Sequence, residues 1–215
     1  SGPSNNIVNQ LYAYYNVSDK VKLSLGNFNT FLGYEVISPA GNFNYSTSYM
    51  FSYGPFSHTG LKADFAFSDM WSGMLAIMNP TDWTEMNPFG LYSFGGQLGY
   101  SNDSGSAYLN VIYGEQVPDS QATFQIDLTT GWDLSETFYL GLNTTYNTTD
   151  GEGFYGAALY PQIQATEKFA LGLRAEYFKE LEDGGFVYGA DVRSLDFTLT
   201  GNYSRGNLSI KPEFR

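Results

Sequence analysis

Apolar and polar residues alternate along most of this chain, and this period of two constrains the fold more than any other feature. Phe124, Ile126 and Leu128, for example, alternate with the polar residues Gln125 and Asp127. Successive side chains of a strand point to opposite faces, so the pattern predicts β-strands that each have one apolar face. No helical pattern competes with it. About twelve strands are predicted, near residues 8–17, 20–28, 59–67, 71–79, 90–101, 105–116, 122–133, 136–148, 153–165, 168–180, 194–204 and 207–215.

The connections between the predicted strands alternate in length. Short turns are expected at residues 18–19, 68–70, 102–104, 134–135, 166–167 and 204–206. Longer connections are expected at about residues 29–58, 80–89, 117–121, 149–152 and 181–193. Tight turns at one end and long loops at the other are typical of bacterial outer-membrane barrels.

Aromatic residues on the apolar face fall into two groups, one at each end of the strands. Those beside the short turns are Phe67, Trp71, Tyr100, Trp132, Phe138, Phe169 and Tyr203, and those toward the long loops are Tyr92, Tyr113, Tyr146, Tyr155 and Tyr177. The two interfaces of a bilayer select such belts. The sequence therefore predicts an all-β fold, a transmembrane antiparallel up-and-down β-barrel, as a single domain over residues 1–215. A soluble β-sandwich with aromatic residues along its core is the alternative.

The strand count predicts a barrel larger than the visible strands. The first predicted strand runs toward a short turn and the last runs away from one, so both ends of the set lie on the loop side. A closed barrel with both termini on the turn side needs at least one more strand at each end. We therefore expect the chain to be a fragment of a barrel of about 14 strands or more, wide enough for an aqueous channel.

Composition excludes several classes of function. The chain carries 22 acidic and 10 basic residues, and its net charge of −12 opposes binding to nucleic acid. Cysteine is absent, which excludes disulfides and thiolate metal sites. The mean hydropathy is −0.26, and no apolar run reaches the ~18 residues of a helical membrane span.

The polar face of the strands supplies the candidate pore-lining residues, because a charge facing lipid at mid-depth costs about 2–4 kcal/mol for Arg or Lys. These candidates are Lys62, Asp64, Asn110, Asp127, Arg174, Glu176, Asp196, Lys211 and Glu213. Charges in such positions tune the selectivity of a pore. Ordinary solvation with lateral ion pairing is the alternative for each of them.

The long connection at about residues 29–58 is the candidate constriction loop, since loops of this length are uncommon without a function. Its candidate residues are Tyr34, Glu35, Tyr45, Tyr49 and His58. Two arrangements stay open, a loop folded into the lumen and an external cap. His58 is the single histidine, so no His pair can bind a metal. We expect no enzyme activity, catalytic residue, cofactor or metal site.

Several short motifs resemble one known family. The segments Leu25-Gly-Asn-Phe28, Leu32-Gly-Tyr-Glu35, Asn42-Phe-Asn-Tyr-Ser46 and Ser52-Tyr-Gly-Pro-Phe-Ser-His-Thr-Gly60 are similar to the OmpL-like outer-membrane β-barrel porins of Bacteroidota. Phe169-Ala-Leu-Gly-Leu-Arg-Ala-Glu-Tyr177 and Ile210-Lys-Pro-Glu-Phe-Arg215 resemble the closing strands of that family. The resemblance implies a porin-like barrel, longer at both ends, and transfers no catalytic residues.

These observations predict passive diffusion of small polar solutes or ions through a barrel in the bacterial outer membrane. The alternative is a non-conducting structural or interaction barrel that is a subunit of a larger cell-envelope complex. A soluble carbohydrate-binding β protein is a more distant possibility, against which the two aromatic belts argue. The expected partners are outer-membrane lipid and small polar solutes, with a homo-oligomer or other envelope proteins as further candidates.

Overall fold

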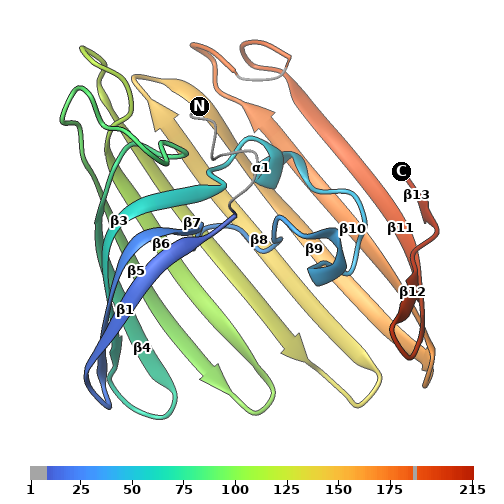
Figure 1. Cartoon of the computed structure of the whole chain (residues 1–215). Helices are drawn as coiled ribbons and strands as arrows, with labels where there is room; N and C mark the ends of the chain where they lie inside the picture. Colours follow the sequence, from blue (N-terminus) through green and yellow to red (C-terminus); the bar gives the residue numbers. More distant parts are fainter. Residues whose placement is uncertain (1–8, 186–187) are drawn as a thin grey trace.

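The computed structural model describes residues 9–185 and 188–215, and the strands within them form one antiparallel sheet (Figure 1). The sheet has 13 strands in these residues, paired in chain order from β1 to β12, and β13 pairs with β11. The bounds are β1 Leu11–Ser18, β2 Val21–Asn29, β3 Ser57–Ala66, β4 Trp71–Met78, β5 Ser93–Asn102, β6 Gly105–Glu115, β7 Ala122–Asp133, β8 Phe138–Thr149, β9 Glu152–Thr166, β10 Phe169–Glu180, β11 Arg193–Arg205, β12 Leu208–Ile210 and β13 Glu213–Phe214. The predicted all-β, up-and-down antiparallel fold is confirmed.

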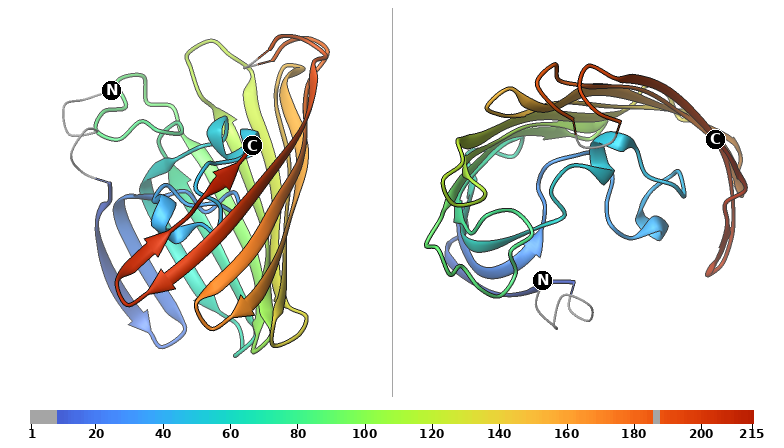
Figure 2. Two further views of the ribbon diagram at one scale, coloured as in Figure 1. Left: turned by 90° about the vertical axis from the view of Figure 1, so that its right-hand side faces the viewer. Right: turned by 90° about the horizontal axis from the view of Figure 1, so that it is seen from above.

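The sheet curves around a concave face when it is seen from above (Figure 2). Its edges are β1 on one side and β12 with β13 on the other, and no pairing joins these edges within the part of the chain that the structure describes. Among the described residues, no helix is both long and apolar enough to cross a membrane.

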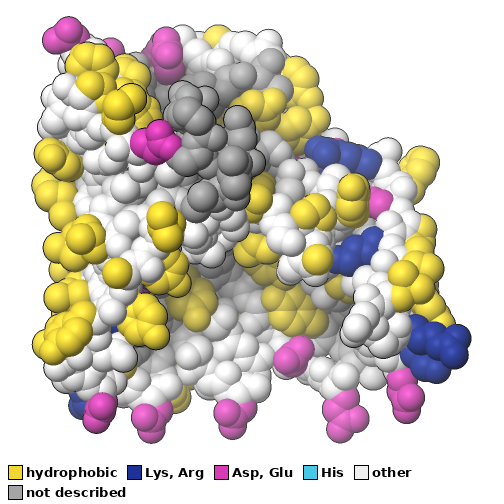
Figure 3. Space-filling model, in the orientation of Figure 1, with side chains coloured by type: hydrophobic (Ala, Val, Ile, Leu, Met, Phe, Trp, Pro, Cys, Tyr) yellow, Lys and Arg dark blue, Asp and Glu magenta, His cyan; other side chains and the backbone are white. Residues whose placement is uncertain are grey.

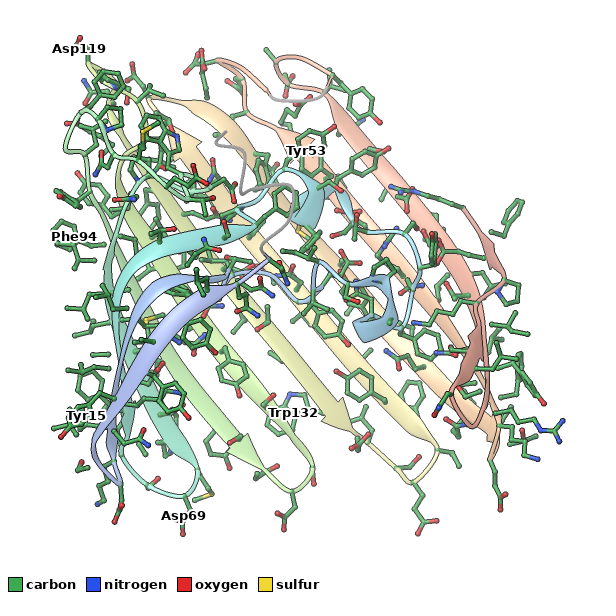
Figure 4. The ribbon with its side chains drawn as sticks, viewed as in Figure 1. Tyr15, Tyr53, Asp69, Phe94, Asp119 and Trp132 are labelled. Carbon is green, nitrogen blue, oxygen red and sulfur yellow. The ribbon has the colours of Figure 1, made fainter. Side chains whose placement is uncertain are left out.

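The alternation of residue types becomes an alternation of faces. On β7, Asp127 lies on the concave face with 2% of its surface exposed, whereas Ile126 beside it is 38% exposed on the convex face. Phe94 of β5 likewise points away from the concave face (Figure 4) and is 59% exposed. The concave face is therefore polar and the convex face apolar, as the period of two predicts.

The aromatic residues of the convex face form rows across neighbouring strands. Near the short turns, Trp71 contacts Tyr100 with 5.0 Å between ring centroids, and Tyr100 contacts Trp132 at 6.3 Å. Near the long loops, Tyr155 contacts Tyr177 at 6.2 Å. Paired strands hold each row in register, because Trp71 pairs with Tyr100 across β4 and β5.

The two ends of the sheet differ in the length of their connections, and both carry exposed acidic side chains. Asp69 marks the short-turn end and Asp119 the opposite end (Figure 4). Acidic side chains are spread along the short-turn end (Figure 3). The exposed acids in these turns are Asp19, Asp69, Asp103, Glu136 and Glu167.

Three local predictions were wrong. The connection predicted as long at 149–152 is a two-residue turn, in which Asp150 and Gly151 have φ of 54° and 86°. Asp-Gly suits such a hairpin turn because both positions need positive φ. The strand predicted at 207–215 is split into β12 and β13, since Pro212 cannot donate to the ladder. Although the sequence shows no helical pattern, two short helical turns occur, η2 (Pro39–Gly41) and α1 (Tyr49–Ser52).

Candidate functional site

Residues 30–56, which connect β2 to β3, cross the concave face of the sheet (Figures 1 and 2). We call them the inserted segment. The long connection predicted at about 29–58 is therefore slightly shorter, because His58 lies in β3. The backbone and side chains of the inserted segment bond to concave-face residues of β7, β8, β10, β11 and β13, and to Lys211 between β12 and β13.

Asp127 of β7 holds the start of the inserted segment. Its carboxylate accepts hydrogen bonds from the Gly33 backbone N at 2.9 Å, from Asn110 Nδ2 at 3.1 Å and from Asn143 Nδ2 at 2.6 Å. Gln97 donates to Asn110 Oδ1 at 2.7 Å and extends the network to β5. A buried carboxylate is tolerated when several donors surround it in this way.

Arg174 of β10 is the centre of a buried ion-pair network. Its guanidinium is fully buried, with Nη1 2.9 Å from Glu35 Oε1 and Nη2 3.7 Å from Asp196 Oδ1. Nη1 also donates to the Ser46 carbonyl at 2.6 Å. Arg215 completes the network, since its Nε lies 2.6 Å from Asp196 Oδ2. Two separate stretches of the inserted segment are thus tied to one cation.

Glu176 holds the first turn of α1. Its two carboxylate oxygens accept hydrogen bonds from the backbone N of Tyr49 and of Met50, both at 2.9 Å. Ser48 caps the same turn, because its Oγ accepts from the Phe51 backbone N at 3.1 Å. A carboxylate at these free N–H groups also interacts favourably with the peptide dipoles of the turn.

Glu213 and Lys211 hold the middle of the inserted segment from the last strands. Glu213 accepts from the backbone N of Tyr45 at 2.7 Å and of Ser46 at 3.0 Å. Lys211 Nζ donates to the Pro39 carbonyl at 3.0 Å and also to the Asn42 carbonyl. These charges therefore satisfy backbone groups of a segment that has almost no regular structure of its own.

Glycines on the concave face provide space for large side chains of the inserted segment. A Cβ added to Gly95 would lie 2.7 Å from Phe31 Cζ, and one added to Gly156 would lie 2.8 Å from Met50 Sδ. Added Cβ atoms at Gly141 and Gly172 would overlap the rings of Tyr34 and Phe43. The absence of Cβ atoms at these positions lets the side chains lie directly against the sheet.

Tyr34 connects the inserted segment to two further aromatic residues. Its ring stacks on Tyr160 of β9 with centroids 4.2 Å apart, and its hydroxyl donates to the Tyr139 hydroxyl at 2.8 Å. Burial, followed by the bond to Tyr139, raises the pKa of Tyr34 well above its ordinary value. The hydroxyl therefore stays protonated at any physiological pH.

Two cavities lie beside this tyrosine pair. The first has a volume of about 420 Å³ and is lined by residues of β5 to β8, including Gln97, Tyr108 and Thr129. The second has a volume of about 590 Å³ and lies between residues 40–44 and strands β8 to β12. Tyr34 and Tyr139 line both cavities, so their hydroxyl contact stands between them.

The structure places the nine predicted pore-lining residues on the concave face, where most of them hold the inserted segment. Asp127, Arg174, Glu176, Lys211 and Glu213 contact the segment directly, as described above. Asn110 donates a hydrogen bond to Asp127, and Asp196 pairs with Arg174, so both support a residue that contacts the segment. Lys62 and Asp64 are different, because they pair with each other at 3.2 Å and stay partly exposed.

The five predicted constriction residues lie in three settings. Tyr34, Glu35 and Tyr49 make the contacts described above, whereas Tyr45 is 62% exposed. His58 was wrongly placed in the loop. It is a fully buried residue of β3, paired with Phe28 of β2, and its Nε2 lies 3.0 Å from Thr30 Oγ1.

Sequence reasoning missed Asn143, Tyr139, Tyr160 and the glycines that face the inserted segment. A signal for the glycines was present, because Gly95, Gly141, Gly156 and Gly172 all stand in polar-face register on strands where other polar-face positions carry larger residues. Isolated glycines inside strands often mark the close approach of another part of the chain.

Comparison with known proteins identifies a family. The family model described as "Putative beta-barrel porin-2, OmpL-like" matches residues 2–215. None of the curated proteins compared with the chain matches it.

Proposed function

Because the chain belongs to the OmpL-like β-barrel porin family, we propose that it allows passive diffusion of small polar solutes or ions across the bacterial outer membrane. The convex face contacts lipid and the concave face lines a water-filled lumen. The inserted segment narrows this lumen, and residues such as Lys62 and Asp64 line the remaining passage. No catalytic step is part of this proposal.

The observation that carries the proposal is the position of the inserted segment. Charged residues from β7, β10 and β13 hold it against the polar face, and cavities of about 420 and 590 Å³ remain beside it. A segment that was mobile would not bury Glu35 and Arg174 together. A fixed obstruction with polar gaps beside it is suited to a narrow pore.

Single-channel conductance in planar bilayers tests the proposal. The protein and a variant in which a short Gly-Ser linker replaces residues 31–55 are compared, and the control replaces residues 117–121, in the loop between β6 and β7, in the same way. We expect steady ohmic conductance that rises when residues 31–55 are replaced and stays unchanged in the control.

The number of bonds that hold the inserted segment also favours a second candidate, a non-conducting structural or interaction barrel in a larger envelope complex. In that case the segment is a plug. Absence of conductance from both the native protein and the variant lacking residues 31–55 would exclude the channel and favour this candidate. Conductance that appears only after the replacement identifies the segment as a plug in a barrel with a passable lumen.

A further inference from the structure

We propose that the cavity between residues 40–44 and strands β8 to β12 binds neutral polyhydroxylated solutes, such as a monosaccharide or disaccharide. Solutes of this class would be those that pass through the lumen, and in this respect the inference rests on the proposed function. The cavity volume is about 590 Å³. This lies within the range of about 300–1,000 Å³ that is common for small-molecule sites.

The charges in the cavity lining already have protein partners, so the cavity favours an uncharged ligand. Among the described residues, its charged side chains are Glu35 and Lys211. Glu35 pairs with Arg174 at 2.9 Å and accepts from the backbone N and Oγ of Ser48, both at 2.7 Å. Lys211 Nζ donates to the carbonyls of Pro39 and Asn42. An ionic ligand would have to displace these bonds.

Aromatic rings in the lining offer fixed apolar surfaces. Tyr34 is bonded to Tyr139 and stacks on Tyr160, which is only 1% exposed and supports the Tyr34 ring from the side of the sheet. The ring of Phe43 lies against Gly172 of β10. A pyranose has one face of C–H groups that packs on such a ring, and its hydroxyl rim stays free for hydrogen bonds.

Amide and hydroxyl groups in the same lining supply the donors and acceptors for that rim. They come from Gln162 of β9, Asn202 and Ser204 of β11 and Ser209 of β12. Ser209 Oγ lies 3.1 Å from Asn202 Oδ1, which fixes the orientation of this amide and keeps Nδ2 as a donor. Sugar hydroxyls both donate and accept, and a mixed neutral rim of this kind matches them better than it matches an ion.

The neighbouring cavity of about 420 Å³ serves as the internal comparison. It shares Tyr34 and Tyr139, but it lacks Phe43 and the Asn202 group, and its lining includes Ser106 and Thr129. Substitutions there change the volume and polarity of the lumen without changing the proposed saccharide contacts.

Saturation-transfer NMR with the detergent-solubilised protein tests the proposal, with maltose as the neutral probe and glucuronate as the charged one. We expect maltose to bind more tightly than glucuronate. Gln162→Ala and Phe43→Leu should each weaken maltose binding about tenfold, while Ser106→Ala and Thr129→Ala leave it unchanged. Circular dichroism confirms that each variant is folded, and Gln162→Ala carries the test if Phe43→Leu is not.

The proposal is overturned if maltose does not bind, if glucuronate binds equally well, or if the Ser106→Ala variant weakens binding as much as Gln162→Ala. Conductance is measured on the same preparations. Conduction without maltose binding rejects the saccharide site alone, whereas maltose binding with the expected variant effects and no conductance rejects the channel and keeps the site.

Discussion

Arg174 Nη1 and Glu35 Oε1 lie 2.9 Å apart in a fully buried ion pair, although 139 positions separate the two residues in the sequence. The pair joins the wall of the sheet to the segment that crosses it. A buried ion pair adds little stability relative to an apolar pair, but losing one partner is costly because a charge is left without compensation. The pair therefore fixes the position of the segment.

Arg174→Ala should reduce the free energy of unfolding by about 3–5 kcal/mol, since it leaves the buried Glu35 carboxylate without its cation. Chemical unfolding of the detergent-folded protein measures this loss. The double variant Glu35→Leu with Arg174→Met should recover part of it, because both charges are then removed. The single variants Glu35→Leu and Arg174→Met are measured beside the double variant. A loss of stability in the double variant equal to the sum of the two single losses would show that the pair is not coupled.

Gly172→Ala should destabilise the protein by about 1–3 kcal/mol, a usual cost of overpacking, because the new methyl group would overlap the Phe43 ring. Gly96→Ala is the matched control on the convex face of β5, where the nearest atom to an added Cβ is Val111 Cγ1 at 3.3 Å. Adding Phe43→Ala to Gly172→Ala should relieve the overlap. Thermal unfolding measures all four proteins, and equal losses from the two glycine changes would contradict the role of Gly172.

Lys62→Gln should shift the ion selectivity of the pore toward cations, because the Lys62 side chain remains 22% exposed on the concave face. Asp64→Asn, at its ion-pair partner, should shift selectivity toward anions. The reversal potential under a salt gradient measures both changes. Lys168→Gln, at an exposed short turn, is the control, and a shift of the same size there would assign selectivity to the rim of the barrel.

The Asp191 carboxyl should titrate below its ordinary pKa of 3.8, because it accepts a hydrogen bond from Lys179 Nζ at 2.8 Å, and the positive charge of Lys179 adds to this effect. A depressed folded-state pKa means that the stabilisation is present above pH 3.8 and is lost as the pH falls through the folded-state value. Side-chain carbon NMR measures the titration midpoint. Lys179→Met should return it toward 3.8, and an unchanged midpoint in this variant would contradict the assigned cause.

The strands could be predicted from the sequence because alternation is a local signal. The apolar Leu61 and the charged Lys62, for example, predict which residues of their strand lie on the convex and on the concave face. Trp71 and Tyr100 likewise predict the aromatic belt beside the short turns. The contacts of the inserted segment could not be predicted, because no local pattern links Glu35 to Arg174 or Gly33 to Asp127. The break at Pro212 could have been predicted, because proline has no backbone N–H group to donate to a β-ladder. The alternation of apolar and polar residues on both sides of Pro212 instead favoured a continuous strand.

The inserted segment also determines the order of events during folding. It lies between β2 and β3, but many of its bonding partners are on β7, β8, β10, β11 and β13. A chain that has formed only its first hairpins offers no partner for these groups, and contacts between residues so far apart in sequence form slowly. The segment can therefore take its final position only after the last strands have joined the sheet, which makes its docking a late and slow step of assembly.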